Sequence, residues 1–405
     1  MKCLLISSFF PPINGGSAVV YEMLCKHSPE SSIMVLAPKR HCATNERLDW
    51  EAYDSNSGFK IFRLSLLRPL VIESKSKLQS LLLTLFYDLP QRIKIFAYTS
   101  WLIKKNDIDI ICIGELNSLS WIGRICKLLY GTKIISYIHG EEVTTETNYI
   151  RYGKNRGHYL RNSDAIVAVS KFTKQYLINR FNLQDSDITL IPNGVDLNKF
   201  NPGIFPSDLI KRYCLTGKFI LITVGRLVPR KGMDNTIKAL PIIIKSVPNV
   251  HYLIIGIGPY EDRLKQLVND YNLNDYVTFT GRIDESELVD HYRLCDIFIM
   301  ANRTMPDGDT EGFGLVFLEA NACAKPVIGG KAGGAVEAVK DGYNGLSVDA
   351  YKPDEIANAV VSIYSDNKLR TKLITNGLDF SNRSSFHNCA SLFNDLCLKI
   401  SNEKQ

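Results

Sequence analysis

The stretch Phe219-Ile-Leu-Ile-Thr-Val-Gly-Arg-Leu-Val-Pro-Arg-Lys-Gly232 decides the expected fold, because an apolar run of strand length leads directly into a glycine and several cations. Near-continuous apolar runs of this length are typical of strands buried on both faces of a parallel sheet. Gly225 permits close backbone approach and Arg226 and Lys231 supply positive charge, which together suit a diphosphate. The alternative is an ordinary surface turn rich in proline, lysine and glycine.

Similar apolar runs recur on either side of this stretch, separated by segments of helix length. Strands alternating with helices predict an α/β fold with parallel sheets covered on both faces. The predicted strands before residue 200 are 3–7, 33–37, 61–64, 108–113, 133–138 and 165–170, and those after it are 219–224, 251–255, 277–280, 297–300 and 326–328.

The length of 405 residues exceeds what one hydrophobic core usually supports, so two domains are expected. Pro202, Gly203 and Pro206 follow the segment Ile191-Pro-Asn-Gly-Val-Asp196 and mark the interdomain linker. We therefore predict two Rossmann-like, doubly wound domains over residues 1–198 and 199–379, facing a cleft, and a helical tail over residues 380–405.

The composition is that of an ordinary soluble globular protein, with 45% hydrophobic and 22% charged residues. The ten cysteines are scattered and show no zinc-ligand spacing, which indicates reduced core residues in a cytoplasmic protein. No run of about 18 apolar residues occurs and the first residues do not resemble a signal peptide, so any membrane contact is expected to be peripheral.

Positive charge is concentrated between residues 60 and 105, where nine Lys or Arg residues face two acids, giving 9 − 2 = +7 against +6 for the whole chain. The same segment is rich in leucine. This combination predicts a basic amphipathic surface on an anionic membrane, on the cytoplasmic face of the inner membrane. The alternative is a helix packed on its own domain with a solvated basic face. Nucleic acid is not an expected partner, because no RNA-recognition signature is present.

The stretch Glu311-Gly-Phe-Gly-Leu-Val-Phe-Leu-Glu319 places two glycines before a run of good helix formers. Bare amides at a helix start favour an anion such as a phosphate. Glu311 is too close to such phosphates to be their ligand and suits a sugar hydroxyl, while Glu319 can accept from a ribose diol. The alternative is a capped helix with two solvated glutamates.

Two further segments end predicted strands of the first domain. Phe9-Phe-Pro-Pro-Ile-Asn-Gly-Gly-Ser17 is a glycine loop without the G-x-G-x-x-G spacing of dinucleotide dehydrogenases. Tyr137-Ile-His-Gly-Glu-Glu142 places His139 at a strand end, where a polar group can meet substrate, although a lone histidine is often structural.

Taken together, these segments resemble the retaining GT-B glycosyltransferases of family 4, also described as glycosyl transferases group 1. The resemblance covers essentially the whole chain, and its wording is nearest to phosphatidylinositol mannoside-type mannosyltransferases. It is specific because the motifs occur in family order: Gly15-Gly16, His139-Gly-Glu, Ala168-Val-Ser170-Lys, Pro192-Asn-Gly-Val-Asp196, Gly225-Arg226 with Lys231-Gly, Phe279-Thr-Gly-Arg282 and the glutamates at 311 and 319.

The resemblance implies a role for each matching residue. Arg226 and Lys231 would neutralise the departing diphosphate, Glu311 would hold the transferred sugar and His139 would touch it near the anomeric carbon. Glu319 would bind the ribose, and the tail after residue 380 would pack back on the first domain. The implied catalytic residues are His139, Arg226, Lys231 and Glu311. The implied donor-binding residues are Gly15, Gly16, Arg226, Lys231, Arg282, Ile283, Glu311, Gly312, Phe313, Gly314, Leu315, Val316 and Glu319.

The implied reaction retains the anomeric configuration through a same-face displacement that needs no glycosidase pair of carboxylates. No Asp-x-Asp motif occurs, so we expect no required metal and no cofactor beyond the nucleotide sugar. The motif wording favours GDP-mannose, with UDP-glucose, UDP-galactose and UDP-N-acetylglucosamine as close alternatives. The expected acceptor is a saccharide or a lipid-linked saccharide, in the biosynthesis of cell-surface polysaccharide, lipopolysaccharide or glycolipid.

Two other functions fit the same architecture. A nucleotide-sugar 2-epimerase would use a carboxylate base, for which Glu141 or Glu142 is available, but the paired glutamates at 311 and 319 favour transfer. A non-catalytic nucleotide-sugar-binding subunit is the second alternative. The intact Arg226 and Lys231 argue against a decayed site.

Overall fold

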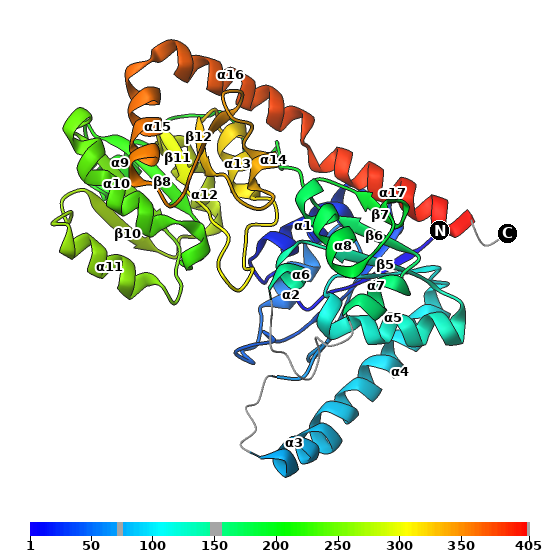
Figure 1. Ribbon diagram of the computed structural model, residues 1–405. Helices are drawn as coiled ribbons and strands as arrows, with labels where there is room; N and C mark the ends of the chain where they lie inside the picture. The colour runs from blue at the N-terminus through cyan, green and yellow to red at the C-terminus, as the bar shows by residue number, and fades with distance from the viewer. Residues whose placement is uncertain (71–75, 146–155, 403–405) are drawn as a thin grey trace. The chain divides into compact units, whose positions relative to one another are not determined.

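The computed structural model describes residues 1–70, 76–145 and 156–402 (Figure 1). The chain forms two compact units. Unit 1 comprises Met1–Val169, Lys174–Ile191 and Phe386–Gln405, and unit 2 comprises Ser170–Thr173 and Pro192–Ser385. The main boundaries therefore lie at 191/192 and 385/386. The sequence analysis had placed them at 198/199 and 379/380.

Unit 1 is built on a seven-stranded parallel sheet of order β3-β2-β1-β4-β5-β6-β7. Every residue of β1 and β4 is buried, which explains why these strands are apolar throughout. The strand order reverses between β1 and β4, so that the loops after these two strands leave the sheet at a topological switch point. The strands are β1 (Cys3–Ile6), β2 (Ile33–Pro38), β3 (Ile61–Leu64), β4 (Ile110–Ile113), β5 (Lys133–Ile138), β6 (Ala165–Ala168) and β7 (Ile188–Leu190).

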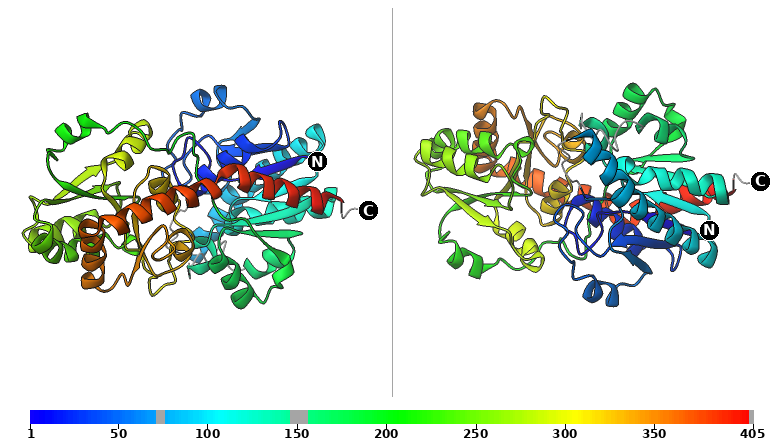
Figure 2. Two further views of the ribbon diagram at one scale, coloured as in Figure 1. Left: turned by 90° about the horizontal axis from the view of Figure 1, so that it is seen from above. Right: turned by 90° about the horizontal axis from the view of Figure 1, so that it is seen from below.

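The helices of unit 1 cover this sheet, and the C-terminal helix α17 packs along α1 near the start of the chain (Figure 2). A short π-helical segment, η1, joins α3 to α4 and makes the three segments one continuous helical run. The helices are α1 (Gly16–His27), α2 (Trp50–Ser55), α3 (Lys77–Leu83), η1 (Thr84–Asp88), α4 (Leu89–Asn106), α5 (Leu116–Tyr130), α6 (Glu141–Thr144), α7 (Arg156–Arg161), α8 (Lys171–Phe181), η2 (Asp185–Asp187) and α17 (Phe386–Asn402).

Unit 2 repeats the same design with a six-stranded parallel sheet of order β10-β9-β8-β11-β12-β13. Its order reverses between β8 and β11. The strands are β8 (Phe219–Val224), β9 (Val250–Ile255), β10 (Val277–Gly281), β11 (Ile297–Met300), β12 (Val327–Gly330) and β13 (Gly345–Val348). The helices are α9 (Ser207–Arg212), η3 (Pro229–Lys231), α10 (Met233–Ser246), α11 (Glu261–Asp270), η4 (Glu285–Glu287), α12 (Leu288–Leu294), α13 (Leu315–Ala322), α14 (Ala335–Ala338), α15 (Pro353–Ser365) and α16 (Asn367–Arg383).

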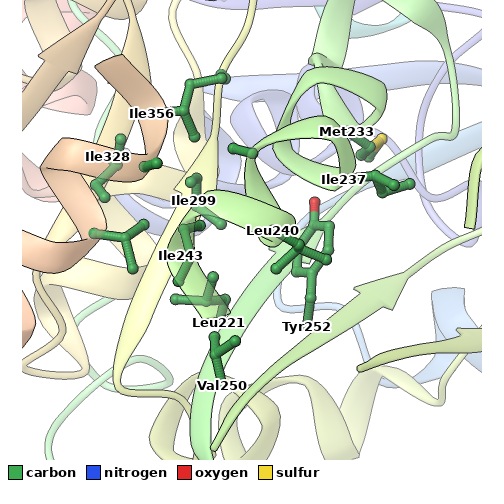
Figure 3. Close-up of a cluster of buried hydrophobic side chains, with 14 of the residues drawn as sticks. Leu221, Met233, Ile237, Leu240, Ile243, Val250, Tyr252, Ile299, Ile328 and Ile356 are labelled. Carbon is green, nitrogen blue, oxygen red and sulfur yellow. The ribbon is translucent and has the colours of Figure 1, made fainter. Parts of the chain in front are cut away.

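The core of unit 2 lies between its sheet and the helices α10 and α15. Figure 3 shows Ile237, Leu240 and Ile243 of α10 in one buried cluster with the strand residues Leu221, Tyr252 and Ile299. These α10 positions recur every three or four residues, so one face of the helix is buried. The same packing fixes β8 and β11, and with them the loops that leave their carboxyl ends.

Two edge strands, β7 and β13, were not predicted from the sequence. Their segments, Ile188-Thr-Leu190 and Gly345-Leu-Ser-Val348, are short and are interrupted by polar residues, so neither forms the continuous apolar run that identified most of the other strands. The cysteines are all free, and all except Cys214 are buried, as expected for core residues. None of the described helices is long and apolar enough to cross a membrane.

Candidate active site

Three of the predicted nucleotide-sugar residues of unit 2, Arg226, Lys231 and Glu311, lie in the loops after β8 and β11, the adjacent strands where the sheet order reverses. Ligands of open α/β sheets bind at such a switch point. Gly225 directly follows β8, with a φ of 150° that favours glycine. A Cβ atom there would lie 3.6 Å from Cε of Lys231, so the glycine leaves its backbone open beside the lysine side chain.

The centre of this region is an ion pair between Lys231 and Glu311. Nζ of Lys231 lies 2.7 Å from Oε2 of Glu311, and only 11% and 13% of their side chains are exposed. Burial opposes ionisation of Glu311, but the charges of Lys231 and Arg230 outweigh it and hold the pKa of this carboxyl below its ordinary value. The site therefore contains an ionised carboxylate bound to a cation.

Two further arginines support the loops that carry this pair. Arg230 contacts Asp309 at 3.2 Å and Glu311 at 3.8 Å, joining the turn after β8 to the loop after β11. Arg303 makes two hydrogen bonds to the carboxylate of Asp234 on α10, at 2.8 and 3.0 Å, and both side chains are buried. The amide of Arg303 also donates to the carbonyl of Arg230. Arg230 and Lys231 of the turn after β8 therefore hold Glu311, and Arg303 joins this turn to α10 through Asp234.

The glycine turn before α13 presents unpaired backbone amides. Gly314 has a φ of 92°, a conformation that L side chains rarely adopt, and it directly precedes the first helical residue. No hydrogen-bond acceptor for the amides of Gly312, Phe313, Gly314, Leu315 and Val316 occurs among the residues that the structure describes. Such amides at a helix start can bind anionic or hydroxyl oxygens.

Glu319 lies in the second turn of α13 and is oriented by a buried tyrosine. The hydroxyl of Tyr292, on α12, donates to Oε2 of Glu319 at 2.6 Å. Burial raises the pKa of Glu319, and the hydrogen bond from Tyr292 opposes this shift by stabilising the carboxylate. Tyr292 itself is fully buried. One carboxylate oxygen is therefore held by the protein, and the other has no partner among the described residues.

The remaining predicted donor residues of unit 2 lie at the surface. Arg226 is exposed and has no ion-pair partner in the described part of the chain, so its charge is available to a ligand. Arg282 is exposed and Ile283 is half-buried, directly after β10. The contacts of these three side chains with a ligand stay predictions.

In unit 1 the predicted residues His139, Gly15 and Gly16 follow strands of the other sheet. Gly15 and Gly16 are exposed, and a Cβ atom at Gly15 would meet nothing within 4 Å, so packing does not require a glycine there. His139 follows β5, and its Nε2 lies 2.8 Å from the hydroxyl of Tyr21 on α1. Burial lowers the pKa of His139 to about 3, so the imidazole is neutral at physiological pH.

Glu142 lies beside His139 and is engaged by the backbone. Its Oε1 accepts from the amide of His139 at 2.6 Å. Burial raises the pKa of Glu142 to about 7, despite this and other backbone hydrogen bonds that favour the charged form. The carboxyl that the sequence offered as an epimerase base is thus bonded to the turn that carries His139.

Several residues of these sites were not predicted from the sequence, among them Tyr21, Arg230, Tyr292 and Arg303. Each acts through a partner elsewhere in the chain; Arg230 lies within the quoted cationic stretch, whereas nothing in the local sequence marks Tyr21, Tyr292 or Arg303. Gly333 and Gly334 were also missed. A Cβ atom on either would collide with the backbone of Glu311 or Gly312, so these glycines let the loop after β12 pack against the Glu311 turn. The Gly-Gly pair after a predicted strand was the available signal.

Comparison with family models gives two matches. The model described as Glycosyl transferases group 1 matches residues 211–380, which include Arg226, Lys231 and both glutamates. The model described as Glycosyltransferase Family 4 matches residues 60–199, which include His139.

Relatives of known function match along most of the chain. A GDP-mannose-dependent alpha-(1-6)-phosphatidylinositol monomannoside mannosyltransferase of Mycolicibacterium smegmatis is 31% identical over 380 residues, covering 90% of this chain and 89% of that protein. A GDP-mannose-dependent monoacylated alpha-(1-6)-phosphatidylinositol monomannoside mannosyltransferase of Corynebacterium glutamicum is 29% identical, covering 90% and 89%.

Solved structures share the fold. A sucrose-phosphate synthase of Thermosynechococcus elongatus superposes with a TM-score of 0.76 at 22% identity, covering 99% of both chains. HepE of Anabaena, in complex with UDP and glucose, superposes with a TM-score of 0.75 at 19% identity, covering 99% of both chains.

Proposed function

Because this chain belongs to the glycosyl transferases group 1 family and has the GT-B fold, we propose that it transfers mannose from GDP-mannose to a saccharide or lipid-linked acceptor with retention of configuration. The predictions of a GT-B fold and of a glycosyltransferase are confirmed. The donor, the acceptor, the stereochemistry and the independence from metal are the proposal. The names of the mycobacterial and corynebacterial relatives support a mannosyl donor and a glycolipid acceptor.

The observation that carries the proposal is the buried pair of Lys231 and Glu311 beside the unpaired amides of Gly312 to Val316. In the proposed step, the bond from the anomeric carbon to the diphosphate oxygen breaks, and a bond to the acceptor oxygen forms on the same face. The acceptor proton passes to the departing diphosphate oxygen. Lys231, Arg226 and the helix amides stabilise the negative charge that develops there, which needs no metal ion.

In this proposal Glu311 and Glu319 bind the two sugars of the donor. Glu311 accepts hydrogen bonds from hydroxyls of the transferred sugar, and Glu319 binds the ribose through the oxygen that Tyr292 leaves available. Arg282 or its neighbour Ile283 borders the base. The contacts of Gly15, Gly16 and His139 remain predictions from the family resemblance.

A thermal-shift screen tests the donor. We expect GDP-mannose to raise the melting temperature more than UDP-glucose, UDP-galactose, UDP-N-acetylglucosamine or an ADP sugar, because a ligand that binds only the folded state stabilises it by about 2.7 kcal/mol at one hundred times its Kd. The Glu319→Ala variant should lose most of this shift if the ligand occupies the proposed site.

The outcomes of this screen are distinct. A larger shift with a UDP sugar would overturn the choice of GDP-mannose.

Incubation with donor alone separates transfer from epimerisation, since an epimerised nucleotide sugar formed without acceptor would identify a 2-epimerase. Proton NMR of the product gives the anomeric configuration, and an unchanged rate in the presence of a chelator would agree with metal independence.

We also propose that unit 1 contacts the cytoplasmic face of an anionic membrane. The contact is made by an apolar stripe along α3, η1 and α4. Figure 1 shows α3 and the start of α4 projecting from the sheet of unit 1. The stripe consists of side chains that are 46–76% exposed and recur every three or four residues: Leu78, Leu81, Leu82, Leu85, Phe86, Leu89 and Ile93. An exposed apolar face of this kind suits the acyl region below the lipid headgroups.

Charge favours an anionic lipid surface over a second copy of the chain. Lys94, Lys104 and Lys105 are exposed, and the one acid of residues 76–106, Asp88, is buried. Two such basic faces would repel each other. The surface is smaller than the predicted segment 60–105, because Arg63 is buried against Asp54, and Leu66 and Leu67 belong to the core. Lys75 lies outside the described residues, as does the side chain of Lys77.

Sedimentation with vesicles tests the membrane proposal. We expect Leu82→Ser/Phe86→Ser to weaken binding to phosphatidylglycerol-containing vesicles by at least tenfold, because burying such side chains contributes about 1.5–3 kcal/mol each. Lys94→Gln/Lys104→Gln should weaken it by a similar factor, at about 1 kcal/mol per cation. The control is Ile204→Ser, which removes an exposed apolar residue of unit 2. Equal sedimentation of all variants would leave the stripe without a lipid role.

A further inference from the structure

A buried tyrosine joins the ends of two strands of unit 1 to His139. Tyr21 of α1 is fully buried, and its hydroxyl lies 2.9 Å from the carbonyl oxygen of Gly114, after β4, and 2.8 Å from Nε2 of His139, after β5. The rings of Tyr21 and His139 make an edge-on contact at 5.1 Å. A Cβ atom at Gly114 would lie 2.9 Å from the ring of Tyr21, so glycine is needed for this approach.

The single phenolic proton decides how these hydrogen bonds run. Burial raises the pKa of Tyr21 well above its ordinary value, so the hydroxyl keeps its proton. If it donates to Gly114, its oxygen must accept a proton from Nε2 of His139. If it donated to His139 instead, the buried carbonyl of Gly114 would have no donor among the described residues, which is the costlier arrangement.

We propose that Tyr21 holds His139 as the Nε2–H tautomer, so that Nδ1 presents a lone pair that accepts a hydrogen bond from a hydroxyl of the transferred sugar. This inference rests on the proposed contact between His139 and that sugar. Nδ1 has no partner among the described residues, and the histidine is only partly buried. Tyr21 is thus a positioning residue that makes the site selective for a hydroxyl over hydrogen or fluorine.

The low pKa of His139, about 3, agrees with this role. A protonated imidazole would donate from both nitrogens, whereas a neutral ring with Nε2 protonated has one acceptor, and that acceptor is Nδ1. The amide of His139 is bonded to Glu142, which fixes the backbone of the same turn. The backbone of this turn and the protonated nitrogen of the imidazole are therefore fixed by separate contacts, with Glu142 and with Tyr21.

The chain offers a matched control in Tyr137. This tyrosine is also fully buried and its ring lies 5.2 Å from that of His139, but its hydroxyl has no hydrogen-bond partner among the described residues. Tyr21→Phe and Tyr137→Phe thus each remove one hydroxyl from a tyrosine whose ring lies beside the same imidazole. Only the first removes a hydrogen bond to it.

The first measurement uses the ligand-free protein and the nitrogen-15 shifts of its histidine rings, with His139 assigned through the loss of its signals in His139→Gln. We expect the Nε2–H tautomer in the wild type and in Tyr137→Phe, and a mixture or the Nδ1–H tautomer in Tyr21→Phe. An Nδ1–H imidazole in the wild type would overturn the proposal without any variant having to fold. An unchanged tautomer in folded Tyr21→Phe would also overturn it.

The second measurement compares the donor with analogues that each lack one hexose hydroxyl. We expect wild type and Tyr137→Phe to prefer the parent donor by at least tenfold in kcat/KM over one of these analogues, and Tyr21→Phe to lose most of that preference. If Tyr21→Phe retained every preference of the wild type, the positioning role would be overturned. If the wild type shows the Nε2–H tautomer but folded His139→Gln keeps every preference of the wild type, the proposed sugar contact fails while the tautomer assignment stands.

Discussion

Replacing Lys231 by alanine is expected to lower the turnover of transfer by about a thousandfold. The lysine is the buried cation of the donor site, and preorganised groups that meet developing negative charge contribute about a hundredfold to a thousandfold each in kcat. Its loss also leaves Glu311 with less compensating charge in a buried position, so the pKa of Glu311 should rise. Steady-state kinetics with the nucleotide sugar and the acceptor measure the loss.

The control for this variant is Lys352→Ala. Lys352 belongs to unit 2 and is paired with Glu355 at 3.1 Å, but 62% of its side chain is exposed. An exposed pair contributes little, so turnover should stay within a factor of two. Circular dichroism and thermal unfolding establish that both variants are folded. Near-normal turnover of folded Lys231→Ala would remove this residue from the diphosphate site.

Replacing Glu311 by glutamine is expected to lower kcat by about a hundredfold to a thousandfold. Glutamine keeps the shape of the side chain but loses the charge that holds Nζ of Lys231 at 2.7 Å. Its amide nitrogen donates hydrogen bonds, so glutamine accepts from a sugar hydroxyl only at its one oxygen, whereas a carboxylate accepts at two. Because the loss concerns alignment in the transition state, kcat should fall more than KM changes.

The double variant Lys231→Ala/Glu311→Gln tests whether the two residues act as one unit. If they do, its turnover should lie close to that of Lys231→Ala alone, since residues in one network are strongly non-additive. The exposed pair provides the comparison, where Lys352→Ala/Glu355→Gln should show no coupling. Normal turnover of Glu311→Gln, or full additivity with Lys231→Ala, would contradict the assignment of this pair to the reaction.

The sequence predicted the parallel sheets because strands buried on both faces must be apolar throughout. Local composition is sufficient for β1, β4, β8 and β11, whose burial is nearly complete. It fails for β7 and β13, whose short segments Ile-Thr-Leu and Gly-Leu-Ser-Val are interrupted by polar residues and resemble loops. The glycine turns at Gly225 and Gly314 were also visible in the sequence, since their backbone conformations suit glycine.

The partners of the predicted residues depend on tertiary structure. The sequence analysis assigned Glu311 to a sugar and Lys231 to a diphosphate, and did not foresee that the two side chains form an ion pair across 80 residues. It counted Arg63 among the surface cations, but this guanidinium is buried against Asp54 and the carbonyl oxygens of Pro11 and Pro38. The number of cations in a segment can be counted from the sequence, but the sequence does not show which of them are buried.

The sequence by itself therefore determined the fold class, the family and the candidate residues, because these depend on local patterns of apolar residues, glycines and charges. Only the tertiary structure decided which groups face one another. Tyr21 reaches His139 across 118 positions and Tyr292 reaches Glu319 across 27, because the order of strands in each sheet brings their helices and loops together. Contacts of this kind fix protonation and orientation, and no local pattern encodes them.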